Sequence, residues 1–178
     1  TFFEPPHPNS ASVIRCIHPP CAGRITRYGA AMTVLEALQQ RILVLDGAMG
    51  SLIQSYDLTE ADYRGDAFQH LEKDQKGNNE LLSITRPDVI RAIHDAYFEA
   101  GADFATTNTF NANHFSLRDF GAEAHTEELN REAARIARAS ADAFSTPERP
   151  RWVLGCLGPT SVSAAMSVDV NDPGARAV

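Results

Sequence analysis

Residues 41–51 read RILVLDGAMGS, an apolar run that stops at Asp-Gly-x-x-Gly. The run at residues 42–45 predicts a strand that is buried on both faces, as strands of parallel sheets are. Asp46 places a carboxylate at the end of this strand, and Gly47 and Gly50 bracket a loop whose backbone can approach a small ligand. Because ligands bind at the carboxyl ends of strands in α/β folds, this junction is the first candidate site.

Two further apolar runs end in the same way. Residues 103–107 lead into Asn108 and Thr109, and residues 152–157 lead into Gly-Pro-Thr at 158–160. Helical stretches separate each run from the next. Short strands that alternate with helices predict a parallel sheet or barrel with right-handed crossovers. The sequence therefore predicts an α/β fold.

The helices are predicted from the spacing of apolar side chains. One helix has Pro87 in its first turn and ends at Gly101, and its pattern places His94 on the solvent-exposed side. A second helix is predicted at residues 126–144. Segment 57–79 is polar and shows little periodicity, and loops of such length are usually functional or mobile.

The composition excludes several classes of protein. The chain has 178 residues, 43% of them hydrophobic, with a formal net charge of -7 and a pI near 5.3. That length suits one domain, and an acidic balance without a basic run argues against nucleic-acid binding. No apolar run approaches the roughly 20 residues of a membrane span. Three cysteines without disulfide spacing favour a reducing, cytoplasmic location.

Residues 1–31 differ in character from the remainder, since they hold five of the ten prolines and show no periodicity. We therefore predict an unstructured or spurious N-terminal extension over residues 1–31 and a domain over residues 32–178. Met32 is a natural start for the product, because Thr33 and Glu36 have the spacing of a capping box before a short helix.

Four motifs together resemble one family, the homocysteine-binding domain of cobalamin-dependent methionine synthase. They occur in the same order as in that family, over about residues 32–173. VDVNDP at residues 168–173 resembles methionine synthase more than other homocysteine S-methyltransferases. The four motifs are DGAMGS (46–51), GNNELL (77–82), AGADFATTNTFNAN (100–113) and GCLGPTS (155–161).

The resemblance implies a particular fold. The family's domain is a (β/α)8 TIM barrel, and such barrels usually need ~250 residues. This sequence holds about three strand–helix units. It is therefore expected to be a fragment, the N-terminal part of such a barrel.

The resemblance also implies a substrate site. In related homocysteine methyltransferases the aspartate that matches Asp46 contacts the amino acid substrate, and here it would hold the ammonium group. The backbone N–H groups of Ala48, Met49 and Gly50, beside Gly47, would bind the substrate carboxylate. The alternative interpretation of Asp46 is a carboxylate that caps a helix or stabilises the loop after a strand.

Asn108 and Thr109 are expected to line a polar substrate pocket. In the alternative interpretation they form a turn whose side chains bond the local backbone. GNNELL is either a turn or a loop over the mouth of the barrel, which would place Asn78 and Asn79 around the site. The family typically reads Glu-Thr-Asn-Thr-Phe where this chain begins with Thr106, so a carboxylate near the mouth is lost.

The resemblance implies zinc as a cofactor. In the family, zinc held by three cysteine thiolates lowers the pKa of the homocysteine thiol. Those ligands are expected beyond this chain, because two of them form an adjacent pair that this sequence lacks. We expect none of Cys16, Cys21 and Cys156 to bind zinc, and Cys156 to be a buried apolar residue. No residue of the chain is assigned a catalytic or metal-binding role.

The function implied is a methyltransferase domain of methionine biosynthesis. It would bind homocysteine as a zinc thiolate and methylate it from methylcobalamin, giving methionine. Its partners would be the cobalamin and methyltetrahydrofolate domains of a full-length chain, and this segment alone is expected to be inactive. Two alternatives remain: a stand-alone homocysteine S-methyltransferase with a sulfonium or betaine donor, and a non-catalytic truncated product.

Overall fold

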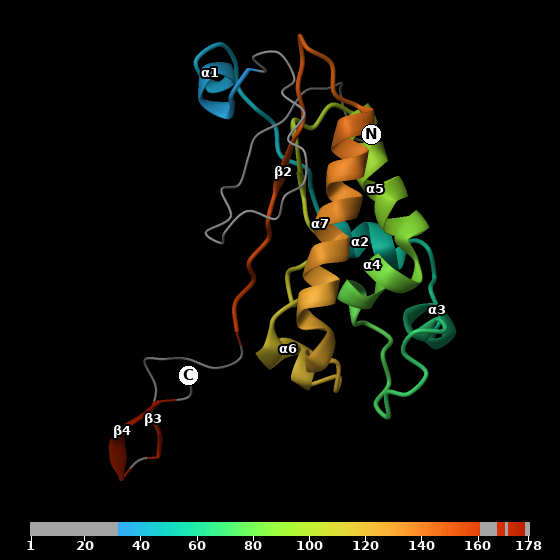
Figure 1. Ribbon diagram of the computed structural model, residues 1–178, viewed down its shortest axis with the longest axis vertical. Coiled ribbons are helices and arrows are strands. Elements are labelled where there is room, and N and C mark those ends of the chain that lie inside the picture. Colours follow the sequence, from blue (N-terminus) through green and yellow to red (C-terminus); the bar gives the residue numbers. More distant parts are fainter. Residues whose placement is uncertain (1–31, 161–166, 170, 177–178) are drawn as a thin grey trace, which may run out of the picture.

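The computed structural model describes residues 32–160, 167–169 and 171–176, so the expectation for residues 1–31 lies outside it (Figure 1). None of the helices within these ranges is long and apolar enough to cross a membrane. In chain order the elements are α1 (Val34–Leu38), α2 (Met49–Gln54), α3 (Glu60–Arg64), η1 (Asn79–Leu81), α4 (Leu82–Thr85), α5 (Pro87–Glu99), β1 (Phe104–Thr106), α6 (His114–Arg118), η2 (Glu123–His125), α7 (Thr126–Ala143), β2 (Trp152–Leu154), β3 (Ser167–Asp169) and β4 (Asp172–Arg176).

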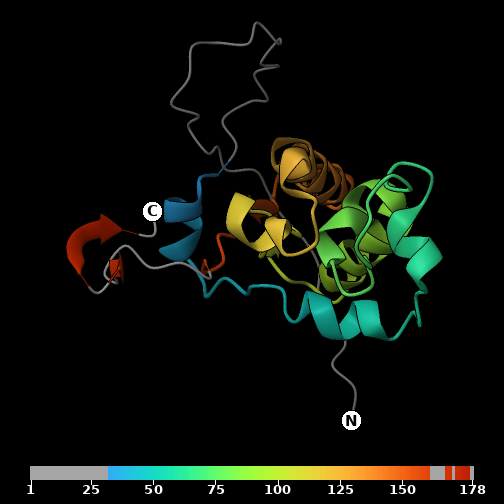
Figure 2. The same cartoon turned by 90° about the horizontal axis from the view of Figure 1, so that it is seen from below.

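Strands β1 and β2 pair in parallel, with Phe104 opposite Trp152 and Thr106 opposite Leu154. Strands β3 and β4 pair antiparallel in a second sheet, which lies apart from the helices (Figure 1 and Figure 2). The expected mixture of helices and parallel strands is confirmed, although both strands are shorter than predicted. Within the described ranges the parallel sheet has only these two strands, so the three-unit barrel stays a prediction.

The first predicted strand, at residues 42–45, is not a strand in the structure, and the expectation that it is buried is wrong. It does run beside β1. The N–H of Asp46 donates to the carbonyl oxygen of Phe104 at 3.2 Å. The N–H of Phe104 donates to the carbonyl oxygen of Val44 at 3.3 Å. These two bonds follow the pattern of a parallel pair. Ile42 is 87% exposed because β2 is the other neighbour of β1, which leaves this segment at the sheet edge.

Charged side chains hold the start of this edge segment. Arg41 donates two hydrogen bonds of 2.6 Å each to the buried carboxylate of Asp103. The same carboxylate accepts the backbone N–H of Val44 at 3.0 Å. Bidentate pairs of arginine and carboxylate combine strength with a defined geometry. The bonds of Asp103 therefore hold residues 41–44 in place, since this segment forms few backbone hydrogen bonds with β1.

Helices α5 and α7 lie side by side and pack on one face of the β1–β2 sheet (Figure 1). Phe98 of α5, Ala141 of α7 and Ala105 of β1 form a buried cluster between them. Arg151, directly before β2, is also buried and donates to the carbonyl oxygens of Ala102 and Phe98, the latter at 2.6 Å. The guanidinium therefore joins the last turn of α5 to the segment that leads into β1.

Helix α1 packs against aromatic side chains of the two strands. Thr33 and Glu36 form the expected capping box, and the Thr33 hydroxyl accepts the N–H of Glu36 at 3.3 Å. The rings of Phe104 and Trp152 stack with their centroids 5.2 Å apart, and Ala37 of α1 packs in the same buried cluster. The sheet is therefore small but has an apolar cluster on each of its two faces.

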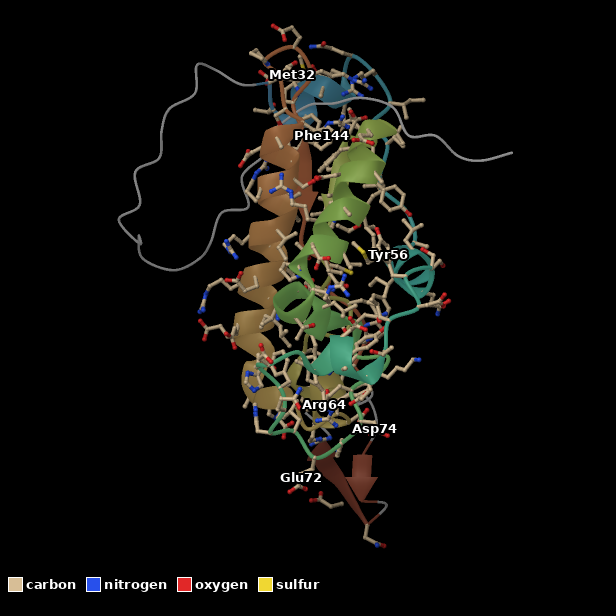
Figure 3. The ribbon with its side chains drawn as sticks, turned by 90° about the vertical axis from the view of Figure 1, so that its right-hand side faces the viewer. Met32, Tyr56, Arg64, Glu72, Asp74 and Phe144 are labelled. Atoms are coloured by element: carbon tan, nitrogen blue, oxygen red, sulfur yellow. The ribbon has the colours of Figure 1, made fainter. Side chains whose placement is uncertain are left out.

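Segment 57–79, expected to be a functional or mobile loop, contains α3 and is held by two charged side chains. Arg64 donates to the backbone carbonyl oxygen of Lys73 at 2.6 Å. Glu60 accepts the backbone N–H of Gln75 at 2.9 Å. Figure 3 shows Arg64 within this segment, at one end of the pair of long helices. These bonds determine the path of the backbone between α3 and η1.

Helix α5 begins at Pro87 as expected and is followed by Gly101, whose φ is 98°. The expectation that His94 is exposed is wrong, because its side chain is fully buried. His94 lies one turn from both Ile90 and Phe98, which are buried as well. Because α5 contacts α2, α7 and β1, its buried face is wider than the apolar stripe in the sequence.

We expect the purified chain to self-associate through apolar side chains that are exposed beside β1 and after β2. Ile42 and Leu157 are 87% and 95% exposed, and Val44 and Leu45 are also exposed. Sheet edges and contiguous apolar surface promote association. The average mass from light scattering should rise with protein concentration, and the double variant Ile42→Lys, Leu157→Lys should rise less. A monomer at every concentration tested would contradict this expectation.

Candidate functional site

Asp46 lies at the end of the edge segment, and a single residue of β1 binds its carboxylate. Oδ2 of Asp46 accepts the backbone N–H of Thr106 at 2.7 Å, and Oδ1 accepts the hydroxyl of the same threonine. The Asp46 side chain is partly buried. The threonine that departs from the family pattern is therefore the residue that contacts the candidate substrate-binding aspartate.

Burial and hydrogen bonds dominate the electrostatic environment of Asp46. Burial raises the pKa of Asp46, and the two hydrogen bonds from Thr106 act in the opposite direction. Within the described ranges, none of the ion pairs includes Asp46. A partly buried carboxylate without a cation carries a desolvation cost that a bound ammonium group would offset.

Residues 47–50 lead from Asp46 into α2. Ala48 occupies the N-cap position and supplies no side-chain hydrogen bond to the helix start at Met49. The hydroxyl of Tyr97, from α5, lies 3.5 Å from the carbonyl oxygen of Ala48. A Cβ atom at Gly47 would lie 3.0 Å from that hydroxyl, so glycine lets α5 approach this loop. Binding of a substrate carboxylate by these backbone N–H groups stays a prediction.

Asn108 and Thr109 are both buried, and their side chains connect three loops. Nδ2 of Asn108 donates to the carbonyl oxygen of Asn79 at 2.8 Å. The Thr109 hydroxyl donates to the carbonyl oxygen of Cys156 at 2.8 Å. These bonds bring GNNELL and the loop after β2 to the end of β1. Whether the two side chains also line a substrate pocket stays a prediction.

The two asparagines of GNNELL have different surroundings. Asn79 faces α2, since its Nδ2 lies 3.9 Å from the position of a Cβ atom at Gly50. Its Oδ1 accepts the hydroxyl of Tyr63 at 3.0 Å. Asn78 is buried and donates to the side chain of Gln75 at 3.1 Å. Asn79 is therefore the member of the pair that contacts the loop of Asp46.

Sequence reasoning missed Glu80, the carboxylate of the same motif. Glu80 is buried, and its Oε1 accepts the backbone N–H of Asn111 at 2.9 Å. Burial raises the pKa of Glu80, and the hydrogen bond from Asn111 opposes this. The sequence signal that could have identified Glu80 is its place between Asn79 and two leucines. A glutamate buried in such a position needs a specific partner. Glu80 ties the loop after β1 to GNNELL.

Cys156 follows β2 and is partly buried. Burial raises the pKa of its thiol, and the negative charges of Asp46 and Glu80 raise it further. In the absence of a metal ion, a thiol with a raised pKa stays protonated at neutral pH. In the part of the chain that the structure describes, no three His, Cys, Asp or Glu side chains are arranged to hold a metal ion. Cys16 and Cys21 lie outside that part.

The loops after β1 and β2 touch at Gly158. A Cβ atom at this position would lie 2.0 Å from the carbonyl oxygen of Phe110, well inside van der Waals contact. Only glycine allows backbone to approach backbone so closely. The contact places the predicted motifs of both strand ends next to each other.

Gly158→Ala is expected to destabilise the chain, because the new methyl group displaces the backbone at Phe110. Overpacking of this kind typically costs about 1–3 kcal/mol. Thermal melts followed by circular dichroism would measure the change. Gly50→Ala is the matched control, because Gly50 lies within α2 and its Cβ atom would make only an ordinary contact with Asn79. Equal melting temperatures for the two variants would show that the loops do not meet at Gly158.

Two grooves on the helical surface are distinct from this candidate site. One, of about 420 Å³, lies between α5 and α7 and is lined by Arg91 and Ile136 among others. The other, of about 200 Å³, lies between α2 and α5, beside Tyr56 and Ile93. Neither is lined by Asp46. Neither of these two grooves is therefore the candidate site.

Comparisons with known proteins identify related sequences and structures. The homocysteine S-methyltransferase family matches residues 43–176. The oxidized form of the homocysteine methyltransferase MmuM from Escherichia coli is 26% identical, with a TM-score of 0.54 over 68% of this chain and 39% of that one. Its metallated form is 27% identical, with a TM-score of 0.50 over 70% and 41% of the two chains. The chain thus spans about two fifths of the length of these structures.

Proposed function

Because this chain belongs to the homocysteine S-methyltransferase family, we propose that it forms part of a domain that binds homocysteine for methylation at sulfur, giving methionine. The observation that carries the proposal is the carboxylate of Asp46, which is partly buried and has no ion-pair partner among the described residues. Homocysteine is an amino acid, and its ammonium group would supply the missing positive charge.

The neighbouring residues suit the remainder of an amino acid. The start of α2 at residues 47–50 follows Asp46 directly and has no side-chain cap, so its N–H groups are suited to a substrate carboxylate. Asn108 and Thr109 hold the adjacent loops together and would form the wall of the pocket. In this proposal the chain binds and orients the substrate, which lowers the entropic part of the reaction barrier.

We further propose that residues 32–178 are the N-terminal part of a (β/α)8 barrel and that residues 1–31 lie outside the domain. The edge segment, β1 and β2 follow one another in space in the order of the sequence, as the first strands of such a barrel do. The similar structures extend well beyond the matched region, since it covers 39% and 41% of their lengths.

The described residues do not fit a zinc site. They contain no group of three His, Cys, Asp or Glu side chains arranged to hold a metal ion. We therefore assign no step of thiol activation to this part of the chain. Any metal that acts in the reaction would need its ligands from other residues.

The methyl donor is the open part of the proposal. Methylcobalamin, with cobalamin and methyltetrahydrofolate domains in the same protein, is the donor that VDVNDP at residues 168–173 favours. A sulfonium or betaine donor is the alternative, since the similar structures are homocysteine methyltransferases in general. Assays of methionine formation by the intact protein with each donor in turn would distinguish them. In either case the protein is expected to act in the cytoplasm.

Binding of homocysteine can be tested on the chain itself. We expect L-homocysteine to shift the backbone amide signals of residues 46–50 in NMR spectra, because its two charged groups would bind there. The matched ligand 4-sulfanylbutanoate lacks the amino group and should shift them less. Equal shifts with both ligands would contradict a role for Asp46 in ammonium binding. The absence of any shift would contradict binding of homocysteine by this part of the domain.

A further inference from the structure

We propose that Thr106 is a positioning residue, which holds the carboxylate of Asp46 in the orientation and ionised state that binds a substrate ammonium group. The identity of the ligand rests on the proposed function. The contact itself, and the experiment on it, concern only Asp46 and Thr106.

The geometry is a two-point attachment. The N–H and the hydroxyl of Thr106 donate to different oxygens of the Asp46 carboxylate, the N–H at 2.7 Å. Rotation of the carboxylate would break both bonds at once. The N–H is fixed because Thr106 lies in β1, and the hydroxyl is restricted because threonine is branched at Cβ and populates few rotamers.

The strand that carries Thr106 is held on its other side as well. Thr106 pairs with Leu154 of β2, and the next residue, Thr107, donates its N–H to the carbonyl oxygen of Leu154 at 2.9 Å. Thr106 therefore belongs to the middle of three adjacent segments. Because Thr106 is held on both sides, its two hydrogen bonds restrain the Asp46 carboxylate at the sheet edge.

The attachment leaves acceptor capacity on Asp46 for a ligand. An ionised carboxylate has about four lone-pair sites, and Thr106 uses one on each oxygen. Within the described ranges no Lys, Arg or His forms an ion pair with Asp46. The unused sites are suited to the N–H groups of an ammonium ion, which needs several acceptors.

Thr106 also affects the charge of Asp46. Burial favours the protonated acid, whereas hydrogen bonds donated to the carboxylate favour the ionised form. Burial raises the pKa of Asp46, and the Thr106 bonds oppose this effect. Without the hydroxyl, the carboxyl group would lose its charge at a higher pH, and it would then attract an ammonium group less strongly.

A purely structural role for the contact makes a different prediction. The start of the edge segment is already held by Arg41 and Asp103, through two bonds of 2.6 Å. If the Thr106 hydroxyl only fastened the end of the segment, its removal would lower stability and raise the pKa of Asp46, but it would leave the affinity for L-homocysteine unchanged at a pH where Asp46 is ionised. The affinity for L-homocysteine is therefore the measurement that separates the two roles.

The experiment follows the carboxyl carbon of Asp46 by NMR in the 178-residue chain labelled with ¹³C-aspartate, as a function of pH. The Asp46→Asn variant would assign the signal. Thr106→Val, which keeps the shape of the side chain and the backbone N–H, should raise the pKa of Asp46 further. Thr106→Ser should restore it. The control Thr85→Val removes a hydroxyl that bonds the carbonyl oxygen of Leu81 and should change nothing.

An unchanged pKa of Asp46 in Thr106→Val would overturn the proposal, as would failure of Thr106→Ser to restore it. If Thr106→Val does not give a dispersed spectrum, the pair Thr106→Ala and Thr106→Ser provides the same comparison. Addition of L-homocysteine should lower the pKa of Asp46, with an affinity roughly tenfold weaker in Thr106→Val. If no variant responds to homocysteine, the proposed function fails, while the titrations still decide whether Thr106 keeps Asp46 ionised.

Discussion

Asp46→Ala is expected to weaken homocysteine binding by roughly 10- to 150-fold in a protein that carries the whole domain. The lost interaction is one charge-assisted contact to the substrate ammonium group, worth ~1.5–3 kcal/mol. The loss should be near the upper end of this range, because the Asp46 side chain is partly buried and solvent screens its charge incompletely. Isothermal titration calorimetry with L-homocysteine would measure it.

The matched control is Asp142→Ala. Asp142 is an exposed carboxylate of α7, and it forms a surface ion pair with Arg138. Its removal should leave the affinity for homocysteine unchanged, since surface pairs contribute little and this one lies on the outer helix. If Asp46→Ala binds homocysteine as tightly as the control does, Asp46 is not part of the site.

The second large effect concerns His94, which should make the chain unstable in mild acid. Burial lowers the pKa of His94 to about 4 from its ordinary value of 6.5. Below about pH 6.5 the unfolded chain therefore takes up a proton that the folded chain does not bind. The free energy of unfolding should fall as the pH is lowered from about 6.5 to about 4. At 1.36 kcal/mol per pH unit, this difference corresponds to about 3 kcal/mol.

The variant His94→Leu should remove this part of the acid sensitivity. Within the described ranges neither ring nitrogen of His94 has a hydrogen-bond partner, so an apolar side chain of similar size leaves no group unsatisfied. Urea unfolding at pH 7 and at pH 4.5 would give the difference for each protein. The control His70→Gln, at an exposed position, should behave like the parent chain. A parent chain and a His94→Leu variant with equal pH dependence would contradict the burial of His94.

Local patterns in the sequence were sufficient for α1, α5, α7, β1 and β2. Helix α5 begins at Pro87 and ends just before Gly101, as expected. Helix α1 starts at the predicted capping box of Thr33 and Glu36. The strands after Gly101 and Pro150 were also located correctly. These features depend on the propensity and spacing of residues within one segment, so they can be predicted from the sequence alone.

The hairpin of β3 and β4 was not anticipated, because its strands are short and β4 contains Pro173 and Gly174, which are residue types depleted in strands. The exposure of residues 42–45 was not anticipated either. An apolar run predicts burial only if other segments cover it, and here β1 covers a single side. The error therefore concerns the neighbours of the segment, which are remote in sequence.

The candidate site divides in the same way. Asp46, the glycines beside it, and Asn108 with Thr109 could be named from the sequence, because strand ends followed by polar or glycine residues are a local pattern. Which groups they bind could not be named, since the partners of Asp46 and Asn108 lie 60 and 29 positions away. The same is true of Glu80, whose partner is 31 positions away.

The sequence by itself determined the family, the alternation of strands and helices, and the position of Asp46 at a strand end. Only the tertiary structure decided that His94 is buried, that Thr106 binds both oxygens of Asp46, and that residues 42–45 lie at an exposed edge. The physical reason is that backbone propensity and motif spacing act over a few residues. Burial, hydrogen-bond partners and pKa shifts depend on which distant segments pack together, and a linear pattern does not contain that information.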